Sequence, residues 1–89
     1  MNILCMHYVY VLQAIDDIEN FYVGCTSDLK TRFDSHNSGQ NKSTKSHRWK
    51  LVYYEAWMTL SAARTREYRL KHCGKTKYQL LKRTKESLE

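Results

Sequence analysis

Three short segments rich in β-branched and aromatic residues constrain the fold of this chain most. They cover residues 8–12, 21–25 and 51–57, and each has the length and composition of one strand. The first two are separated by the polar stretch AIDDIEN, which suits a hairpin connection. Helical patterns follow the second and the third segment. The predicted class is therefore α+β, with a three-stranded antiparallel sheet flanked by helices in the order β-β-α-β-α-α.

Capping residues and turn signals set the predicted helices. Asp28 is a candidate N-cap for the first helix, which is expected to end at residues 37–39. The second helix is predicted over residues 61–73, because the residue that follows is a glycine. A basic third helix is expected to span about residues 75–85.

The length and the position of the charges bound the domain and its partners. A chain of 89 residues forms one domain, with a core expected over residues 7–74 and a basic C-terminal helix over about 75–89. Residues 1–63 carry six basic and six acidic side chains, whereas residues 64–89 carry nine basic and three acidic ones. The whole net charge of +6 therefore lies in the last 26 residues, which favours a phosphate-bearing partner. The alternative is a basic tail that keeps the chain in solution.

The cysteines and the N-terminal segment indicate the compartment. The three cysteines, at positions 5, 25 and 73, are odd in number and show no CxxC spacing. Neither a disulfide framework nor a zinc site is therefore expected. Residues 1–15 carry no charged side chain, but they are too short to span a membrane and lack the basic start of a signal peptide. A cytoplasmic protein without a membrane partner is the expectation.

One acidic residue interrupts the apolar stripe of the second predicted helix. Ala63, Leu70 and Cys73 recur at helical spacing, and Glu67 lies within their stripe. An ionised carboxylate that points toward a core needs a cation or a metal ion to compensate its charge. The alternative is an ordinary surface ion pair with Lys71, four residues further along the helix.

Polar side chains on the first helix and the first two strands form a second group. Arg32 and His36 are four residues apart and share a helix face, where they could hold a phosphate or lie on a solvated edge. If the hairpin pairs as expected, Tyr10 and Tyr22 lie near each other on one face of the sheet. Gly24 would leave room for a ligand to approach the backbone. For each tyrosine alone, packing is the ordinary role.

The residues singled out above fall in an ordered series of motifs. The series resembles the GIY-YIG nuclease family, and most of all its small stand-alone bacterial (YhbQ-like) members, over residues 8 to about 73. The matching segments are Val9-Tyr10-Val11, Tyr22-Val23-Gly24, KTRFDSHNSG with Arg32 and His36, RWKLVYYEAW at 48–57, and residues 63–71 around Glu67. Two departures concern the motifs themselves. Val9 replaces the glycine of the first motif, and Cys25 stands where some nucleases of the family have a lysine.

The resemblance implies an activity and a role for each site residue. The implied activity is that of an endonuclease, which hydrolyses phosphodiester bonds with one divalent metal ion, Mg²⁺ or Mn²⁺. By motif position, the implied catalytic residues are Tyr10, Tyr22, Arg32 and His36, and the implied metal ligand is Glu67. One of the tyrosines would take a proton from the attacking water, which requires nearby cations to lower its pKa.

Basic residues outside this set are expected to bind the nucleic-acid backbone. They are Lys42, Lys45, Arg48, Arg64, Lys71, Lys75 and Lys77. Trp49 and Trp57 are expected in the core rather than on a base-stacking surface. The expected substrate is DNA rather than RNA, either single-stranded or of a particular structure, and a role in repair or recombination rests on family analogy. The chain is expected to be a monomer or a weak homodimer. Two alternatives stay open: a nucleic-acid-binding module of the same fold with little or no catalysis, and a subunit that needs a protein partner.

Overall fold

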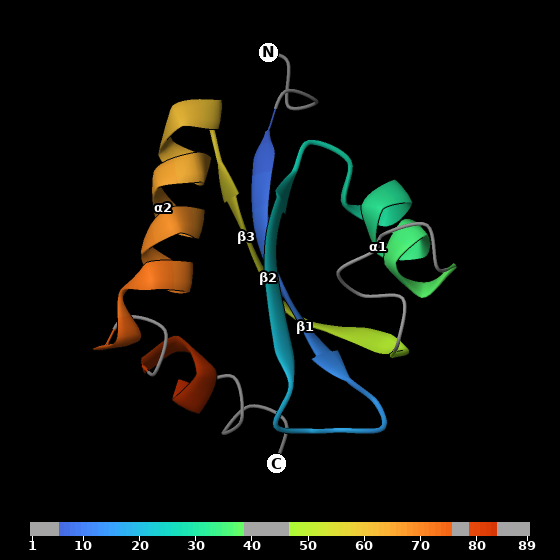
Figure 1. Cartoon of the computed structure of the whole chain (residues 1–89). Coiled ribbons are helices and arrows are strands. Elements are labelled where there is room, and N and C mark those ends of the chain that lie inside the picture. The colour runs from blue at the N-terminus through green and yellow to red at the C-terminus, as the bar shows by residue number, and fades with distance from the viewer. Residues whose placement is uncertain (1–5, 39–46, 76–78, 84–89) are drawn as a thin grey trace.

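A three-stranded antiparallel sheet with the strand order β2-β1-β3 lies at the centre of the molecule (Figure 1). The computed structural model describes residues 6–38, 47–75 and 79–83. Its elements are β1 (His7–Ala14), β2 (Phe21–Thr26), α1 (Leu29–Asn37), β3 (Trp49–Trp57) and α2 (Leu60–His72). This order confirms the predicted α+β class and the first five predicted elements. Residues 79–83, which belong to the predicted third helix, are also helical.

The central strand β1 is covered on both faces, because α1 and α2 lie on opposite sides of the sheet (Figure 1). Successive side chains of a strand point to opposite faces. Val9 and Val11 therefore belong to the core on the α2 side, whereas Tyr10, Leu12 and Ala14 belong to the core on the α1 side. Burial on both faces explains why the sequence of this strand is almost continuously apolar and aromatic.

The helix α2 packs on the sheet through a short apolar stripe. Its N-cap, Thr59, accepts a hydrogen bond from a backbone N–H of the first turn, and Ala63 and Leu70 are buried. The prediction that Cys73 continues the stripe is wrong, since Cys73 is exposed. Cys73 is the C-cap and has an extended backbone (φ −103°, ψ 102°), so its side chain leaves the helical repeat. Neither α2 nor any other helix of the described ranges is long and apolar enough to cross a membrane.

Both ends of α1 are held by side chains. Asp28 is the N-cap, as predicted, and accepts a hydrogen bond from the backbone N–H of Thr31 at 3.2 Å. At the other end the Asn37 amide accepts from the Trp49 N–H at 2.7 Å and donates to the Trp49 carbonyl at 2.9 Å. This two-bond clamp ties the last turn of α1 to the start of β3. Trp49 is buried, which confirms its predicted place in the core, and Trp57 is partly buried against the core on the α2 side.

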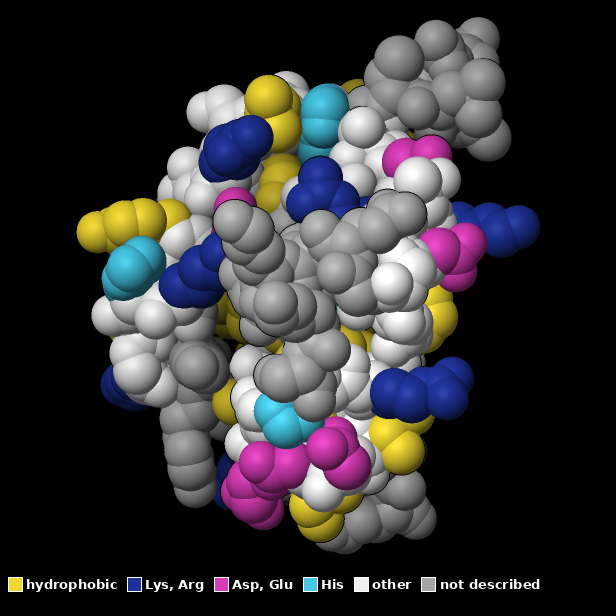
Figure 2. Space-filling view, turned by 45° about the vertical axis from the view of Figure 1, so that its right-hand side comes forward, with side chains coloured by type: hydrophobic (Ala, Val, Ile, Leu, Met, Phe, Trp, Pro, Cys, Tyr) yellow, Lys and Arg dark blue, Asp and Glu magenta, His cyan; other side chains and the backbone are white. Residues whose placement is uncertain are grey.

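Charge is distributed unevenly over the face that Figure 2 shows. Acidic side chains gather at its lower end, and most of the Lys and Arg side chains lie above them, together with a few further acidic ones. The connection between β1 and β2 lies at the lower end of the molecule in Figure 1, and it contains the exposed residues Asp16, Asp17 and Glu19. The hairpin end therefore repels a polyanion.

Candidate active site

A buried hydrogen bond between Tyr10 and His36 forms the centre of the candidate site. Tyr10 Oη lies 2.7 Å from His36 Nε2, and both side chains are fully buried, although they come from β1 and α1. Burial lowers the pKa of His36, and the charge of Arg32 lowers it further. The imidazole is therefore neutral near pH 7, and an unprotonated Nε2 can accept the phenolic proton of Tyr10.

The expectation that cations lower the pKa of the catalytic tyrosine is wrong for Tyr10. Burial raises the pKa of Tyr10 well above its ordinary value, the Tyr22 phenol adds to the rise, and the Arg32 charge opposes it. The reason is that almost no surface of the Tyr10 side chain reaches water, so the cost of an uncompensated phenolate exceeds the attraction of the cation. Tyr10 can act as a base only if another group accepts its phenolic proton.

Tyr22 lies on the solvent side of this pair. Its ring centroid is 4.8 Å from that of His36 and 6.5 Å from that of Tyr10, and the side chain is half-buried. Strand pairing explains the proximity, because Tyr10 is opposite Gly24 and Leu12 is opposite Tyr22. The two tyrosines are therefore diagonal neighbours on one face, as predicted.

Gly24 gives the Tyr10 ring its space. A Cβ built on residue 24 would collide with the end of the Tyr10 ring, and even the Cε1 atom of that ring would be only 2.9 Å away. The prediction that Gly24 leaves room for a ligand is therefore wrong, because the ring of the opposite residue fills that room. A side chain at residue 24 would displace Tyr10 from His36.

A Gly24→Ala variant tests this packing. Its free energy of unfolding is expected to fall by about 1–3 kcal/mol, which is typical of overpacking in a rigid core. Gly74→Ala is the matched control, since a Cβ at residue 74 meets nothing within 4 Å. Urea denaturation of both variants measures the difference. Equal stabilities for the two variants would contradict the assigned contact.

Arg32 and Arg64 line a hollow of about 240 Å³. Arg32 belongs to α1 and Arg64 to α2, and both are exposed. Cys25 lies in the same hollow, and burial raises the pKa of its thiol, so that it is protonated at neutral pH. The two guanidinium groups supply the positive charge that a phosphate requires.

Glu67 and Lys71 line a second hollow, of about 300 Å³, together with Arg64. The Glu67 side chain is 18% exposed, and its Oε2 lies 3.0 Å from Lys71 Nζ. The ion pair that the sequence offered as an alternative is therefore present. The Lys71 ammonium also lies 5.9 Å from the centre of the Tyr22 ring, and the Glu67 charge acts to raise the pKa of Tyr10. The two hollows share Arg64, and Lys71 of the second hollow lies over the Tyr22 ring, so the tyrosine pair, the carboxylate and the cations are connected in one candidate site.

The donor set at this site suits a hard cation that keeps most of its water. Within the ranges that the structure describes, no three His, Cys, Asp or Glu side chains form a metal-binding group. The carboxylate that the sequence predicts as a ligand, Glu67, faces an open hollow. Mg²⁺ is commonly held by one or two carboxylates, with water and substrate phosphate as the other ligands, so Glu67 fits this type of binding and not a closed zinc site.

The remaining predicted residues lie outside this cluster. Arg48 precedes β3 and Lys75 follows α2, and both are exposed but line neither hollow. Lys42, Lys45 and Lys77 lie outside the described residues.

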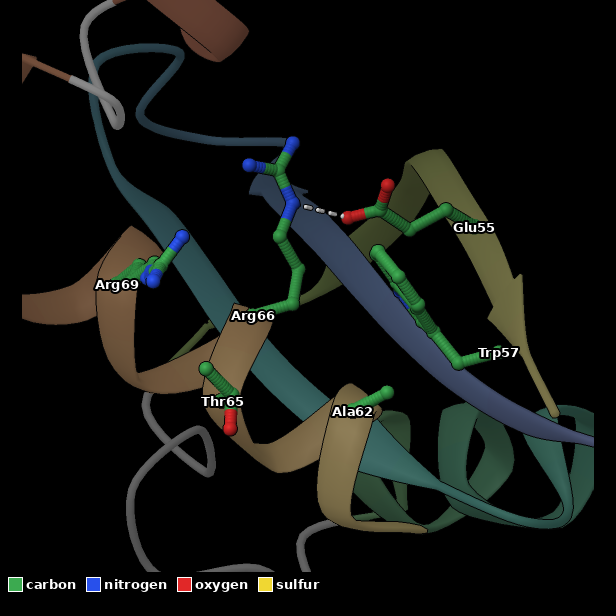
Figure 3. Close-up of a pocket in the computed structure, with 6 residues that line it drawn as sticks. All are labelled: Glu55, Trp57, Ala62, Thr65, Arg66 and Arg69. Atoms are coloured by element: carbon green, nitrogen blue, oxygen red, sulfur yellow. Dashed lines mark hydrogen bonds and ion pairs between the residues drawn. The ribbon is translucent and has the colours of Figure 1, made fainter. Parts of the chain in front are cut away.

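A larger hollow of about 480 Å³ lies between α2 and β3 (Figure 3). In it Arg66 Nε donates to Glu55 Oε1 at 2.6 Å, so that this guanidinium and this carboxylate already compensate each other. The side chains of Glu67 and Lys71 do not line this hollow. They line the hollow of about 300 Å³, on a different face of α2. Glu55 is therefore a useful comparison for Glu67: both are largely buried, ion-paired carboxylates.

Sequence reasoning missed four residues around the site. Asn37 positions the end of α1, Cys25 lines the first hollow, and Tyr68 and His72 line the second. The last pair could have been found in the sequence. Tyr68 and His72 are four residues apart on one helix, and each directly follows a predicted site residue, Glu67 or Lys71.

The chain is similar to known proteins over most of its length. A family model described as "GIY-YIG catalytic domain" matches residues 6–84. A UPF0213 protein of Haloquadratum walsbyi is 36% identical over 77 residues, which cover 84% of each chain. A UPF0213 protein of Bacillus pumilus is 40% identical over 76 residues, which cover 83% of this chain and 76% of that one. Among solved structures, the solution NMR structure of a UPF0213 protein from Bacillus halodurans matches with a TM-score of 0.53 and 34% identity, over 86% of this chain and 83% of that one.

Proposed function

The chain belongs to the GIY-YIG catalytic domain family, and we propose that it is a metal-dependent endonuclease that hydrolyses phosphodiester bonds in DNA. The proposal rests on the buried Tyr10–His36 hydrogen bond and on Glu67, whose charge acts on Tyr10. A neutral phenol bonded to a neutral imidazole is arranged to move a proton, and the adjacent hollows carry the charges that a phosphate needs.

The proton moves through Tyr10 to His36 in this proposal. In the complex with the substrate, a water that reaches Tyr10 Oη, which is buried in the free protein, gives up its proton as Tyr10 passes its own proton to His36 Nε2. No buried phenolate has to exist before the reaction, which removes the difficulty of the raised Tyr10 pKa. His36 becomes positively charged only as the water attacks the phosphorus.

Arg32, Arg64 and Lys71 bind the phosphate and balance the charge that develops on it. Glu67 would hold one Mg²⁺ or Mn²⁺ ion, which would polarise the phosphate and stabilise the leaving oxygen. Lys71 must then share or release the Glu67 carboxylate, since the two groups form an ion pair at 3.0 Å in the free protein.

The cleavage rate is expected to depend on the protonation of His36. Protonated His36 cannot accept the Tyr10 proton. The rate should therefore rise with pH through the pKa of His36, which is lowered from its ordinary value of about 6.5, and it should change little at higher pH. The free energy of unfolding should follow the same direction, because below that ordinary value the unfolded chain binds the proton more readily than the folded one. Rates of a His47→Gln variant, which keeps His36, serve as the control. A rate that keeps rising above pH 7 would contradict this assignment.

A cleavage assay tests the proposed function. Labelled single-stranded, duplex and branched DNA, and RNA, are incubated with Mg²⁺, Mn²⁺ or a chelator, and a Glu67→Ala variant purified in parallel reveals any contaminating nuclease. Cation-dependent cutting by the parent alone is the expected result, with DNA cut faster than RNA. Equal cutting by parent and variant would reject the assignment of the site.

A binding module with little or no catalysis is the second candidate. The observation in its favour is that Lys71 already neutralises Glu67, so that the carboxylate has less need of a metal ion. This candidate predicts salt-sensitive binding of DNA without cutting under any condition.

The proposal also covers the compartment, the biological role and the oligomeric state. We expect a cytoplasmic protein that acts in repair or recombination as a monomer or a weak homodimer. Sedimentation of the pure chain, alone and with candidate partners, distinguishes it from a subunit that cuts only in a complex.

A further inference from the structure

An exposed pair of aromatic rings lies on α2 next to Glu67. The Tyr68 side chain is 65% exposed, and its ring centroid is 4.4 Å from that of His72, with the two planes 35° apart. Tyr68 takes part in neither core cluster of the described residues. Single exposed tyrosines are common on protein surfaces, but this one is held against a second ring one helical turn away.

The rings share their hollow with the charged groups of the site. Arg64, Glu67 and Lys71 line the same space of about 300 Å³ as Tyr68 and His72. A strand whose phosphate is bound by the cations therefore passes directly beside two aromatic faces. Cationic groups next to aromatic rings are the combination with which proteins bind single-stranded nucleic acid.

We propose that Tyr68 and His72 form a platform on which an unpaired nucleobase of the substrate strand stacks. The proposal rests on the proposed function, and it names the substrate class as a strand whose base is free next to the bound phosphate. In a duplex that base is paired and stacked inside the helix, out of reach of the rings. Because His72 already holds the Tyr68 ring, little side-chain freedom is lost when the base binds.

The hollow between α2 and β3 does not offer such a platform. Figure 3 shows Trp57 beside Glu55 and Arg66, and the charge of Arg66 is already compensated by Glu55 at 2.6 Å. The Trp57 ring is partly buried and packs against the core, whereas the Tyr68 ring is open to solvent. The stacking surface therefore belongs to the hollow that contains Glu67.

Binding measured in a chelator tests the platform without requiring cleavage. An oligothymidine strand and an abasic strand of equal length carry the same phosphates, but only the first has bases. Tyr68→Ala is expected to weaken binding of the thymidine strand about fivefold or more and to leave binding of the abasic strand unchanged. Tyr68→Phe keeps the ring and should bind both strands like the parent. Arg64→Gln should weaken both strands by a similar factor, because it removes a backbone contact.

Three results would overturn the platform. They are unchanged thymidine binding by Tyr68→Ala, an equal loss on both strands, and a parent that does not prefer the thymidine strand. Far-UV circular dichroism shows that each variant is folded, and the exposure of Tyr68 means that its removal leaves the core intact. Because no cleavage is measured, a parent that fails the nuclease assay can still show stacking, and a nuclease can still fail this test.

Discussion

Replacement of Glu67 by glutamine is expected to abolish cation-dependent cleavage while DNA binding stays close to that of the parent. Glutamine keeps the shape of the side chain but cannot supply the charge that holds a divalent cation. A lost metal contribution of several kcal/mol corresponds to a rate at least about 1,000-fold lower. Binding at low salt should tighten slightly, because Lys71 loses the carboxylate that lies 3.0 Å away.

Glu55→Gln is the matched control for this experiment. The Glu55 side chain is 21% exposed and forms an ion pair with Arg66, so the substitution changes the same charge in a similar environment. It is expected to cut like the parent, since Glu55 faces the other hollow (Figure 3). Single-turnover cleavage of both variants, at several Mg²⁺ and Mn²⁺ concentrations, gives the comparison. If Glu67→Gln cuts as fast as Glu55→Gln, then Glu67 does not hold the metal ion.

Removal of the Tyr10 hydroxyl is the second substitution expected to have a large effect. Tyr10→Phe deletes the group that links the attacking water to His36, so the cleavage rate should fall by about 100- to 10,000-fold. The loss should appear in kcat and not in KM, because Tyr10 is fully buried and contributes little to substrate binding. The free energy of unfolding should decrease by only about 0.5–1.5 kcal/mol for the lost hydrogen bond.

Tyr53→Phe controls for the loss of a partly buried phenol. The Tyr53 hydroxyl donates to Glu55 Oε2 at 3.2 Å, on the opposite face of the sheet from His36. Its removal should cost a similar stability and leave the cleavage rate near that of the parent. A Tyr10→Phe variant with the parent's rate would instead assign the proton transfer to Tyr22, the half-buried tyrosine of the site.

Residue periodicity and capping chemistry made much of the fold predictable. The three strands, the N-cap Asp28 and the proximity of Tyr10 to Tyr22 each follow from local patterns that the tertiary structure does not override. The stripe of α2 was predictable only as far as Leu70. Whether the chain keeps helical dihedrals at Cys73 depends on the cap geometry, which a repeat of three and four residues does not contain.

The internal arrangement of the site could not be read from residue types. Gly24 indicates free space next to the backbone, but only strand pairing shows that the Tyr10 ring fills it. The same packing buries the phenol and reverses the expected direction of its pKa. The sequence is equally compatible with a solvated His36 on the edge of α1. In the structure two hydrogen bonds join Asn37 to the start of β3, and the neighbouring His36 is buried.

The order of the elements along the chain divides the site between an early and a late part of the sequence. The rings and Arg32 lie on β1, β2 and α1, whereas Glu67 and Lys71 lie on α2, which follows the last strand of the sheet. During synthesis the proton-transfer residues therefore leave the ribosome well before the carboxylate. A chain that ends before α2 lacks both Glu67 and the helix that covers Val9 and Val11, so it completes neither the core nor the site. On the proposed function, nuclease activity therefore arises only in chains that include the whole of α2.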